Sequence, residues 1–321
     1  MLRPCFRIST LILLLFSLFA TGCRQAEPPP TTPEPTALDE PGPFQMAKYN
    51  TALVNDLGRY PSTVYYPAQS TSDGLLPDHS QGPYPAVTFS PGLASNKSFN
   101  RWVGMHLATH GYVVLIFTVP NPLLLRTHQQ EAGFASGFDK LAAENANPAS
   151  PLHNLVDLER RAIMGHSLGA MASLRAAAYM DVDAVVPLAP YTIETEALTA
   201  ITAPTQIQAA TQDCITGPDK AQIDYDNLGA QVKQLVTING GNHVSFNDAN
   251  SLAETVGGPL FDCPKVINTM DHHQRLSRRY FTAWLDYFLK GHTEVEGFLF
   301  GEPAQQDLLT ELLTALEFIR P

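Results

Sequence analysis

The chain has 321 residues, in which 31 acidic side chains outnumber 20 lysines and arginines, so its formal net charge is −11. Hydrophobic residues make up 44% of the sequence and charged residues only 16%, against roughly 25% charged in an average globular domain. This composition excludes a wholly disordered chain, and the lack of basic runs excludes a protein that binds nucleic acid through phosphate contacts.

The first 22 residues have the pattern of an export signal. Arg3 and Arg7 precede a short, largely apolar stretch at 8–20, which falls below the roughly 20 residues that span a bilayer. Small residues then lead directly to Cys23, as in the processing site of bacterial lipoproteins. We expect residues 1–22 to be removed and Cys23 to carry the lipid, so that the protein is held at a periplasmic or cell-surface membrane only by this anchor. The alternative is a plain signal peptide for secretion.

Residues 24–43 are rich in proline and contain few large apolar side chains. Such a segment buries too little surface to fold, and we expect an extended, semi-rigid spacer. Together with Cys23 it forms an expected lipidated linker over 23–43. The remainder, 44–321, is expected to be a single catalytic domain and a monomer.

Apolar runs that suit strands alternate with amphipathic segments that suit helices along the body of the chain. The run at 112–117 is apolar throughout, as expected for a strand that is buried on both faces. We expect strands at 85–90, 112–117, 161–164, 184–188, 205–210 and 235–238, and helices at 96–110, 168–180 and 272–289. This alternation predicts an α/β fold, with a mainly parallel sheet covered by helices on both faces.

The run Gly165-His166-Ser167-Leu168-Gly169 has the G-x-S-x-G pattern and lies between an expected strand and an expected helix. In that context the serine stands on a sharp turn that lifts its hydroxyl clear of the sheet, and the glycines let neighbouring backbones pass closely. The N–H groups that begin the helix point toward the same place. We predict Ser167 as a nucleophile; the alternative is a tight turn without chemistry.

A serine nucleophile needs a histidine base, which in this arrangement follows the serine in the chain with an acid between them. His243 lies in a glycine-rich loop directly after the strand expected at 235–238. A loop in that place reaches back over the carboxyl edge of the sheet, so we predict His243 as the base. The other downstream histidines, expected in surface or packing roles, are His272, His273 and His292.

The acid that orients the imidazole and stabilises its charged form is predicted to be Asp213, directly after the strand expected at 205–210. Its rivals Asp181 and Asp183 precede a strand and therefore belong at the opposite edge of a parallel sheet. The remaining aspartates near this loop are expected at surface positions of a helix: Asp219, Asp224 and Asp226.

Two backbone N–H groups are needed to hold the oxyanion that forms during acyl transfer. One is expected from Leu168, directly after the nucleophile. The other is expected from Leu93, in the loop that follows the strand at 85–90. A simple turn is the alternative for that loop.

Several segments of the body carry a family resemblance: 89–92, 107–114, 165–170, 203–205 and 239–243. They resemble the α/β-hydrolase superfamily, and within it the dienelactone-hydrolase-like branch that includes cutinase-type polyester hydrolases and platelet-activating-factor acetylhydrolase relatives. The resemblance implies an α/β-hydrolase fold and a serine carboxylic-ester hydrolase that acts through an acyl-enzyme on small, lipid-like or polyester esters. The alternatives are a peptidase or acyltransferase with the same triad, and a non-catalytic surface lipoprotein of this fold.

The chain departs from this branch at Ala170-Met171-Ala172, where the polyester hydrolases have more glycine, and at three further positions. Ser167 stands where dienelactone hydrolases proper have cysteine, Leu93 where polyester hydrolases usually have an aromatic residue, and Tyr191 where they usually have tryptophan. We take Tyr191 and His166 as candidate substrate-binding residues, with ordinary packing as the alternative for Tyr191. The segment 120–157 is expected to border the pocket.

Two cysteines, Cys214 and Cys263, remain in the body once the signal and the lipid site are set aside. In an exported protein we expect these two to pair, which would tie the Asp213 loop to the segment that follows His243. Two buried free thiols are the alternative.

No metal or organic cofactor is expected. His106 and His110 lie four residues apart, but the glutamate of a zinc-binding H-E-x-x-H motif is missing. The sequence also has no glycine-rich phosphate loop or dinucleotide fingerprint.

Overall fold

The computed structural model describes residues 37–72, 74–248, 264 and 266–320, which belong to the second of two compact units, 1–34 and 35–321. The predicted signal segment, Cys23 and most of the predicted linker lie outside the described residues. The end of that linker is packed: Leu38 is buried in the core, and the Gly42 N–H donates to Thr109 Oγ1 at 2.9 Å. The packed part of the chain therefore begins before Phe44, because burial stabilises an apolar side chain such as Leu38.

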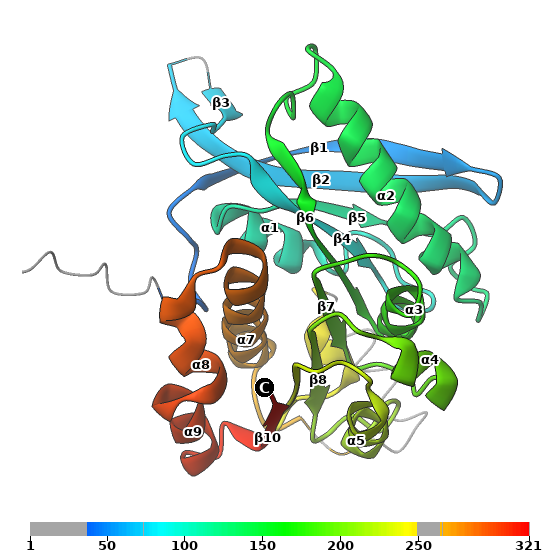
Figure 1. The fold of residues 1–321 in the computed structure, drawn as a ribbon, viewed down its shortest axis with the longest axis vertical. Helices are drawn as coiled ribbons and strands as arrows, with labels where there is room; N and C mark the ends of the chain where they lie inside the picture. Colours follow the sequence, from blue (N-terminus) through cyan, green and yellow to red (C-terminus); the bar gives the residue numbers. More distant parts are fainter. Residues whose placement is uncertain (1–36, 73, 249–263, 265, 321) are drawn as a thin grey trace, which may run out of the picture. The chain divides into compact units, whose positions relative to one another are not determined.

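The strands of the described part form one mixed sheet (Figure 1). They are β1 (Gln45–Asn55), β2 (Gly58–Thr71), β3 (Gly74–Pro77), β4 (Tyr84–Ser90), β5 (Val113–Phe117), β6 (Val156–His166), β7 (Ala184–Leu188), β8 (Thr205–Ala210), β9 (Lys233–Ile238) and β10 (Leu313–Ile319). The order is β1-β2-β5-β4-β6-β7-β8-β9-β10, with β3 paired to β2. The strands from β5 to β9 run parallel, whereas β1, β2, β3 and β10 pair antiparallel with their neighbours.

Helices cover both faces of this sheet, which confirms the predicted α/β class (Figure 1). One face carries α1 (Arg101–Thr109), α7 (Met270–Lys290), α8 (Glu296–Phe300) and α9 (Glu302–Leu309). The other carries α2 (His128–Ala146), α3 (Leu168–Ala177), α4 (Thr195–Ala200) and α5 (Pro218–Asn227). None of the described helices is both long and apolar enough to cross a membrane.

Side-chain alternation along the central strands separates two apolar cores. On β5, Ile116 packs into the core that contains Trp284 of α7. Its neighbour Phe117 points to the opposite face and meets Phe134 of α2, with ring centres 5.5 Å apart. Successive side chains of a strand point to opposite faces, so an uninterrupted apolar run is what a strand between two helix layers requires.

The predicted strands and helices are confirmed, with differences at their ends. The helix predicted over 96–110 begins only at Arg101, and the strand predicted over 161–164 is longer, because β6 starts at Val156. The segment 120–157 contains α2, which the sequence did not indicate. The other described α-helices and β-strands without a prediction are β1, β2, β3, β10, α4, α8 and α9.

Candidate active site

Ser167 stands on a strained turn between β6 and α3. Its φ of 56° and ψ of −119° lie in a region that side-chain-bearing residues rarely adopt. The turn fits because its flanking residues have no side chain: a Cβ at Gly165 would overlap the carbonyl oxygen of Gly169, and one at Gly169 would overlap that of Ser90. The sequence therefore closes the turn tightly enough to present the serine hydroxyl at the carboxyl edge of the sheet.

Ser167, His243 and Asp213 come from three separate loops and meet in one line of hydrogen bonds. Ser167 Oγ lies 2.9 Å from His243 Nε2, and His243 Nδ1 lies 2.8 Å from Asp213 Oδ2. All three residues are buried. Because the carboxylate can only accept, Nδ1 carries the imidazole proton and Nε2 is left with a lone pair that faces the serine hydroxyl.

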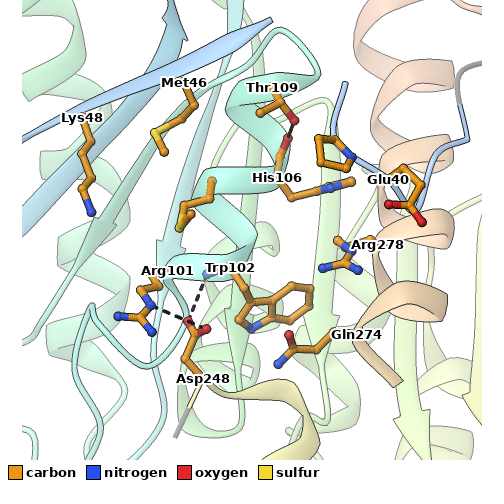
Figure 2. Close-up of a pocket in the computed structure, with 12 residues that line it drawn as sticks. Glu40, Met46, Lys48, Arg101, Trp102, His106, Thr109, Asp248, Gln274 and Arg278 are labelled. Carbon is orange, nitrogen blue, oxygen red and sulfur yellow. Dashed lines mark hydrogen bonds and ion pairs between the residues drawn. The ribbon is translucent and has the colours of Figure 1, made fainter. Parts of the chain in front are cut away.

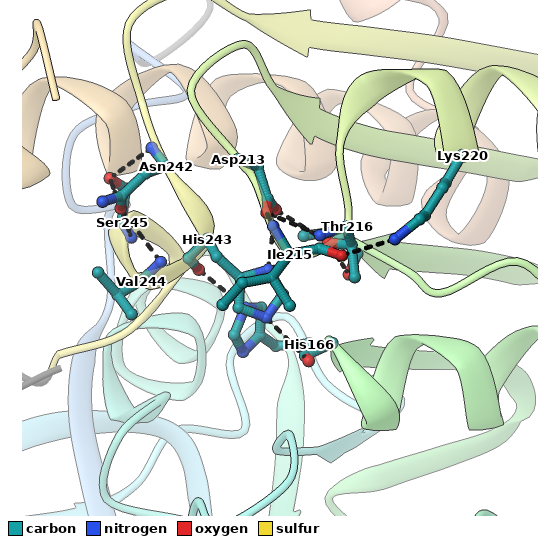
Figure 3. Close-up of polar contacts among 11 residues, drawn as sticks. His166, Asp213, Ile215, Thr216, Lys220, Asn242, His243, Val244 and Ser245 are labelled. Carbon is teal, nitrogen blue, oxygen red and sulfur yellow. Dashed lines mark hydrogen bonds and ion pairs between the residues drawn. The ribbon is translucent and has the colours of Figure 1, made fainter. Parts of the chain in front are cut away.

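The loop that follows β8 keeps Asp213 ionised (Figure 3). Burial acts to raise the pKa of this carboxyl, but the His243 ring and the N–H groups of Thr216 and Ile215 outweigh burial and lower the pKa to about 2. Both N–H groups donate to Oδ1 at 2.8 Å. Asp213 is therefore a fixed negative charge beside the imidazole at neutral pH.

Thr216 is a member of this cluster that the sequence analysis missed. Its hydroxyl lies 2.8 Å from Asp213 Oδ2, 3.0 Å from His243 Nδ1 and 3.1 Å from the Ala189 carbonyl oxygen. A hydroxyl has one proton, and the charged carboxylate is the strongest of these acceptors, so the Thr216 hydroxyl donates to Asp213 Oδ2. The available signal was its position three residues after an aspartate, where side-chain-capped turns are common.

The segment that carries His243 is held from below by His166 (Figure 3). His166 Nε2 donates to the His243 carbonyl oxygen at 3.0 Å, and the two ring centres are 4.7 Å apart. Burial and the neighbouring His243 lower the pKa of His166 to about 3, so its ring is neutral. His166 thus lies buried beneath His243, a position that leaves little of its side chain for the predicted contact with substrate.

More distant groups fix the end of the same segment, η1 (His243–Phe246). The Phe246 carbonyl oxygen accepts from Asn100 Nδ2 at 2.9 Å and from Trp102 Nε1 at 3.0 Å. Gln274 of α7 donates to the Asn247 carbonyl oxygen at 3.0 Å. His243 is therefore anchored to both α1 and α7.

The two predicted oxyanion donors flank Ser167. Leu168 is the first residue of α3, where an N–H has no intrahelical acceptor. On the other side, the loop after β4 passes so close that a Cβ at Gly92 would lie 2.9 Å from the Ser167 Cβ. Leu93 follows, and within the described part of the chain its N–H has no hydrogen-bond acceptor.

The remaining predicted site residues fall into different surroundings. Tyr191 is half-buried, with Lys220 Nζ 4.8 Å from its ring centre. Cys214 is disulfide-bonded, but its predicted partner Cys263 lies outside the described residues, as does Cys23. The pairing and the lipidation stay predictions.

Asp224 does not lie at the helix surface position predicted from the sequence. It was expected at the surface of a helix, but in α5 it faces inward and is fully buried. Among the described residues, its carboxylate accepts one hydrogen bond, from the Ile193 N–H to Oδ1 at 3.4 Å. Burial raises the pKa of this carboxyl to about 7. The expectation failed because Asp224 lies on the face of α5 that packs against the sheet. Asp181, by contrast, is fully exposed.

Two hollows lie near these elements. A cavity of about 680 Å³ beside α1 includes Trp102 and Gln274 in its wall, but not Ser167, Asp213 or His243 (Figure 2). A groove of about 400 Å³ adjoins the site itself, because Leu168 and Met171 of α3 line it. Among the residues that the structure describes, no group of histidine, cysteine and acidic side chains is arranged to hold a metal ion.

Comparison with known proteins gives a family match over most of the chain. The profile of the PETase family, described as PET hydrolase-like, matches residues 20–312. A cutinase from Thermobifida fusca is 27% identical over 287 residues, which cover 87% of this chain and 82% of the cutinase. Cutinase 1 from Thermobifida cellulosilytica is 27% identical over 281 residues, 85% of this chain and 92% of the relative. A bis(hydroxyethyl) terephthalate hydrolase from Streptomyces coelicolor is 26% identical over 298 residues, which cover 90% of this chain and 82% of the relative.

Proposed function

The chain belongs to the PET hydrolase-like family, and on this premise we propose that Ser167, His243 and Asp213 hydrolyse the ester bonds of polyester chains. Membership makes the protein a carboxylic ester hydrolase with an α/β-hydrolase fold. The observation that carries the triad assignment is the continuous line from Ser167 Oγ through the imidazole to Asp213, with contacts of 2.9 Å and 2.8 Å.

The first half of the reaction forms an acyl-enzyme. Ser167 Oγ attacks the ester carbonyl carbon while His243 Nε2 takes the hydroxyl proton. The negative charge that develops on the carbonyl oxygen is held by the N–H groups of Leu93 and Leu168. When the C–O bond to the alcohol breaks, His243 returns the proton to the leaving oxygen, and the acyl group stays on Ser167.

The second half repeats these steps with water. The water oxygen attacks the acyl carbon while His243 takes a proton from the water. The same two N–H groups hold the second oxyanion. The bond to Ser167 then breaks, the serine recovers its proton from His243, and a carboxylic acid leaves. Asp213 stays ionised throughout and stabilises the imidazolium, in keeping with the lowering of its pKa to about 2.

The decisive test compares the purified protein with Ser167→Ala on p-nitrophenyl esters and on a polyester film. We expect ester hydrolysis by the parent and its loss in the variant, whereas a matched exposed-serine control, Ser70→Ala, stays active. Labelling with a fluorophosphonate, followed by peptide mass mapping, should place the adduct on Ser167. The proposal would be refuted if the folded protein neither hydrolysed any ester nor took the label. That result would favour a non-catalytic surface protein. Cleavage of amides, or acyl transfer to alcohols in preference to water, would instead favour the peptidase or acyltransferase alternatives.

We also propose that the protein is exported and anchored through lipid on Cys23, with the proline-rich segment as spacer, and that Cys214 pairs with Cys263. The first rests on the sequence pattern and the second on the disulfide-bonded state of Cys214. Incorporation of labelled palmitate that is lost in Cys23→Ala tests the anchor. A disulfide-linked Cys214–Cys263 peptide in a non-reducing digest tests the pairing, and light scattering tests the expected monomer.

A further inference from the structure

The cavity of about 680 Å³ lies over one face of α1, with residues of β1 and α7 in its side walls (Figure 2). Its size falls within the roughly 300–1,000 Å³ that is common for small-molecule sites. Because Ser167, Asp213 and His243 are not in its wall, a molecule bound there would leave the ester site at Ser167 unoccupied.

The floor of this cavity is largely apolar. Trp102 and Met105 of α1 line it, together with the half-buried Met46 of β1. Met105 is 40% exposed, so a ligand that covers it removes apolar surface from water. The ring of His106 is also in the wall, and burial, with the neighbouring His110, lowers the pKa of His106 well below its ordinary value. That ring is therefore uncharged at neutral pH.

Three cations and two acids border this apolar floor among the described residues: Lys48, Arg101, Arg278, Glu40 and Asp248. Both acids already have a cation beside them. Glu40 Oε1 lies 2.6 Å from Arg275 Nη2, outside the cavity wall. Asp248 lies 3.6 Å from Arg101 and accepts the Trp102 N–H at 3.1 Å.

Lys48 and Arg278 are left without a close counter-charge, and Figure 2 shows them on opposite sides of α1. In the described part of the chain, no carboxylate lies within ion-pair distance of Lys48 Nζ, and that of Asp271, 3.9 Å from Arg278, is 78% exposed. The Arg278 side chain itself is only 18% exposed, and its Nε is buried without a hydrogen-bond acceptor among the described residues. A largely buried cation in this state is stabilised by an anion that completes its hydrogen bonds.

We propose that this cavity binds a carboxylate with an apolar body, the carboxyl group against Arg278 and the apolar part over Met105 and Trp102. A guanidinium group matches the two oxygens of a carboxylate, and the chain as a whole carries a net charge of −11, so two uncompensated cations make this cavity a local site of attraction for an anion. The choice of a carboxylate among anions rests on the proposed function, which releases a carboxylic acid. The cavity and its charges do not depend on that function.

Fluorescence of Trp102 tests the inference without turnover. The chain has two tryptophans, so Trp102 alone remains in the double variant Ser167→Ala/Trp284→Phe. In this background we expect decanoate to change the emission saturably and to bind at least about tenfold tighter than decanol, which lacks the charge. Arg278→Gln should weaken decanoate binding at least about tenfold and change decanol binding less than twofold. The matched control is Arg59→Gln, which removes an exposed charge of β2 outside the cavity wall and should change decanoate binding less than twofold.

A second variant tests the apolar floor at an exposed position, where folding tolerates the change. Met105→Ser should weaken decanoate binding about fivefold, because it removes apolar area that the ligand covers. Its control is Ile223→Ser, since Ile223 is 49% exposed on α5 and outside the cavity wall, and it should change binding less than twofold. Unfolding in urea, measured on every variant, separates loss of binding from loss of the fold.

Equal affinities for decanoate and decanol would overturn the inference, as would equal effects of the cavity variants and their controls. Tighter binding of decyl phosphate than of decanoate would overturn the choice of a carboxylate. Binding to phosphatidylglycerol vesicles that depends on Arg278, with no binding of decanoate, would overturn the inference in favour of a lipid surface. Absence of esterase activity in the parent would refute the proposed function and leave the binding results readable.

Discussion

Removal of the Thr216 hydroxyl is the sharpest test of how the triad is positioned. Thr216→Val keeps the shape of the side chain but takes away the group that lies 2.8 Å from Asp213 Oδ2 and 3.0 Å from His243 Nδ1. Asp213 retains the N–H groups of Ile215 and Thr216 and the imidazole N–H. One partner of four is lost, so the variant should be impaired and not inactive.

The magnitude follows from the strength of a hydrogen bond to a charged group, about 1.5–3 kcal/mol. Loss of such a bond in the transition state lowers the rate about 10- to 150-fold. Replacement of the acid itself in comparable triads costs about 10⁴-fold. Because Thr216 is placed to touch His243 and Asp213 and not the substrate, kcat should carry the loss, and KM should change less than about twofold.

The assay is steady-state hydrolysis of p-nitrophenyl butyrate by Thr216→Val and Thr216→Ser, with unfolding in urea measured in parallel. Serine restores the hydroxyl and should recover kcat to within about threefold. Thr282→Val is the matched control, because Thr282 is also buried and its hydroxyl lies 2.9 Å from His106 Nε2, away from the triad. Unchanged kcat in Thr216→Val, or equal kcat losses in the valine and serine variants, would refute the reasoning.

Three further changes test the proposed nucleophile, the tight turn between β6 and α3, and the buried Asp224. Ser167→Ala should lower kcat on p-nitrophenyl butyrate at least about 10³-fold with little change in melting temperature, and retention of more than a tenth of the activity would contradict its role. Gly169→Ala would place a Cβ against the Ser90 carbonyl oxygen and should destabilise the fold by about 1–3 kcal/mol. The control is Gly297→Ala, which should not destabilise the fold because its Cβ would come no closer than 3.7 Å to a neighbour. Equal melting temperatures for the two variants would count against the packing argument. Burial raises the pKa of Asp224 to about 7 from its ordinary 3.8, so the parent should lose up to about 4 kcal/mol of stability as pH rises from 4 to 7. Relative to the parent, Asp224→Asn should therefore gain stability between pH 4.5 and pH 8 in urea unfolding, and a pH-independent difference would show that Asp224 titrates normally.

The sequence predicted the core of the site because each part carries its own local signal. Ser167 lies between two glycines at a strand-to-helix junction, and Asp213 and His243 each follow a strand whose residues are all apolar or buried. Parallel strands place the loops after them at one edge of the sheet. Strand order along the chain was therefore enough to bring the three residues together.

Elements at the edges of the sheet could not be predicted in the same way. β1 is exposed or half-buried at every position except Leu53 and has no regular apolar period, and its place comes from pairing with β2. β10 pairs with β9 from the far end of the chain. The stability of such strands depends on the partner they meet, which a local pattern does not encode.

Taken alone, then, the sequence determined the central parallel strands, the turn at Ser167 and the order of the three residues of the proposed triad, because these follow from side-chain period and from glycine at a crowded turn. Only the tertiary structure decided that His166 supports His243 from below, that Thr216 contacts Asp213, that Asp224 faces the core, and that the loop of Ala94 is hydrogen-bonded to the loop of Pro122. Each of these depends on contacts between segments distant in the chain, or on which face of a helix meets the sheet. Burial and hydrogen bonding of this kind are set by packing, and a residue's neighbours in space are not its neighbours in sequence.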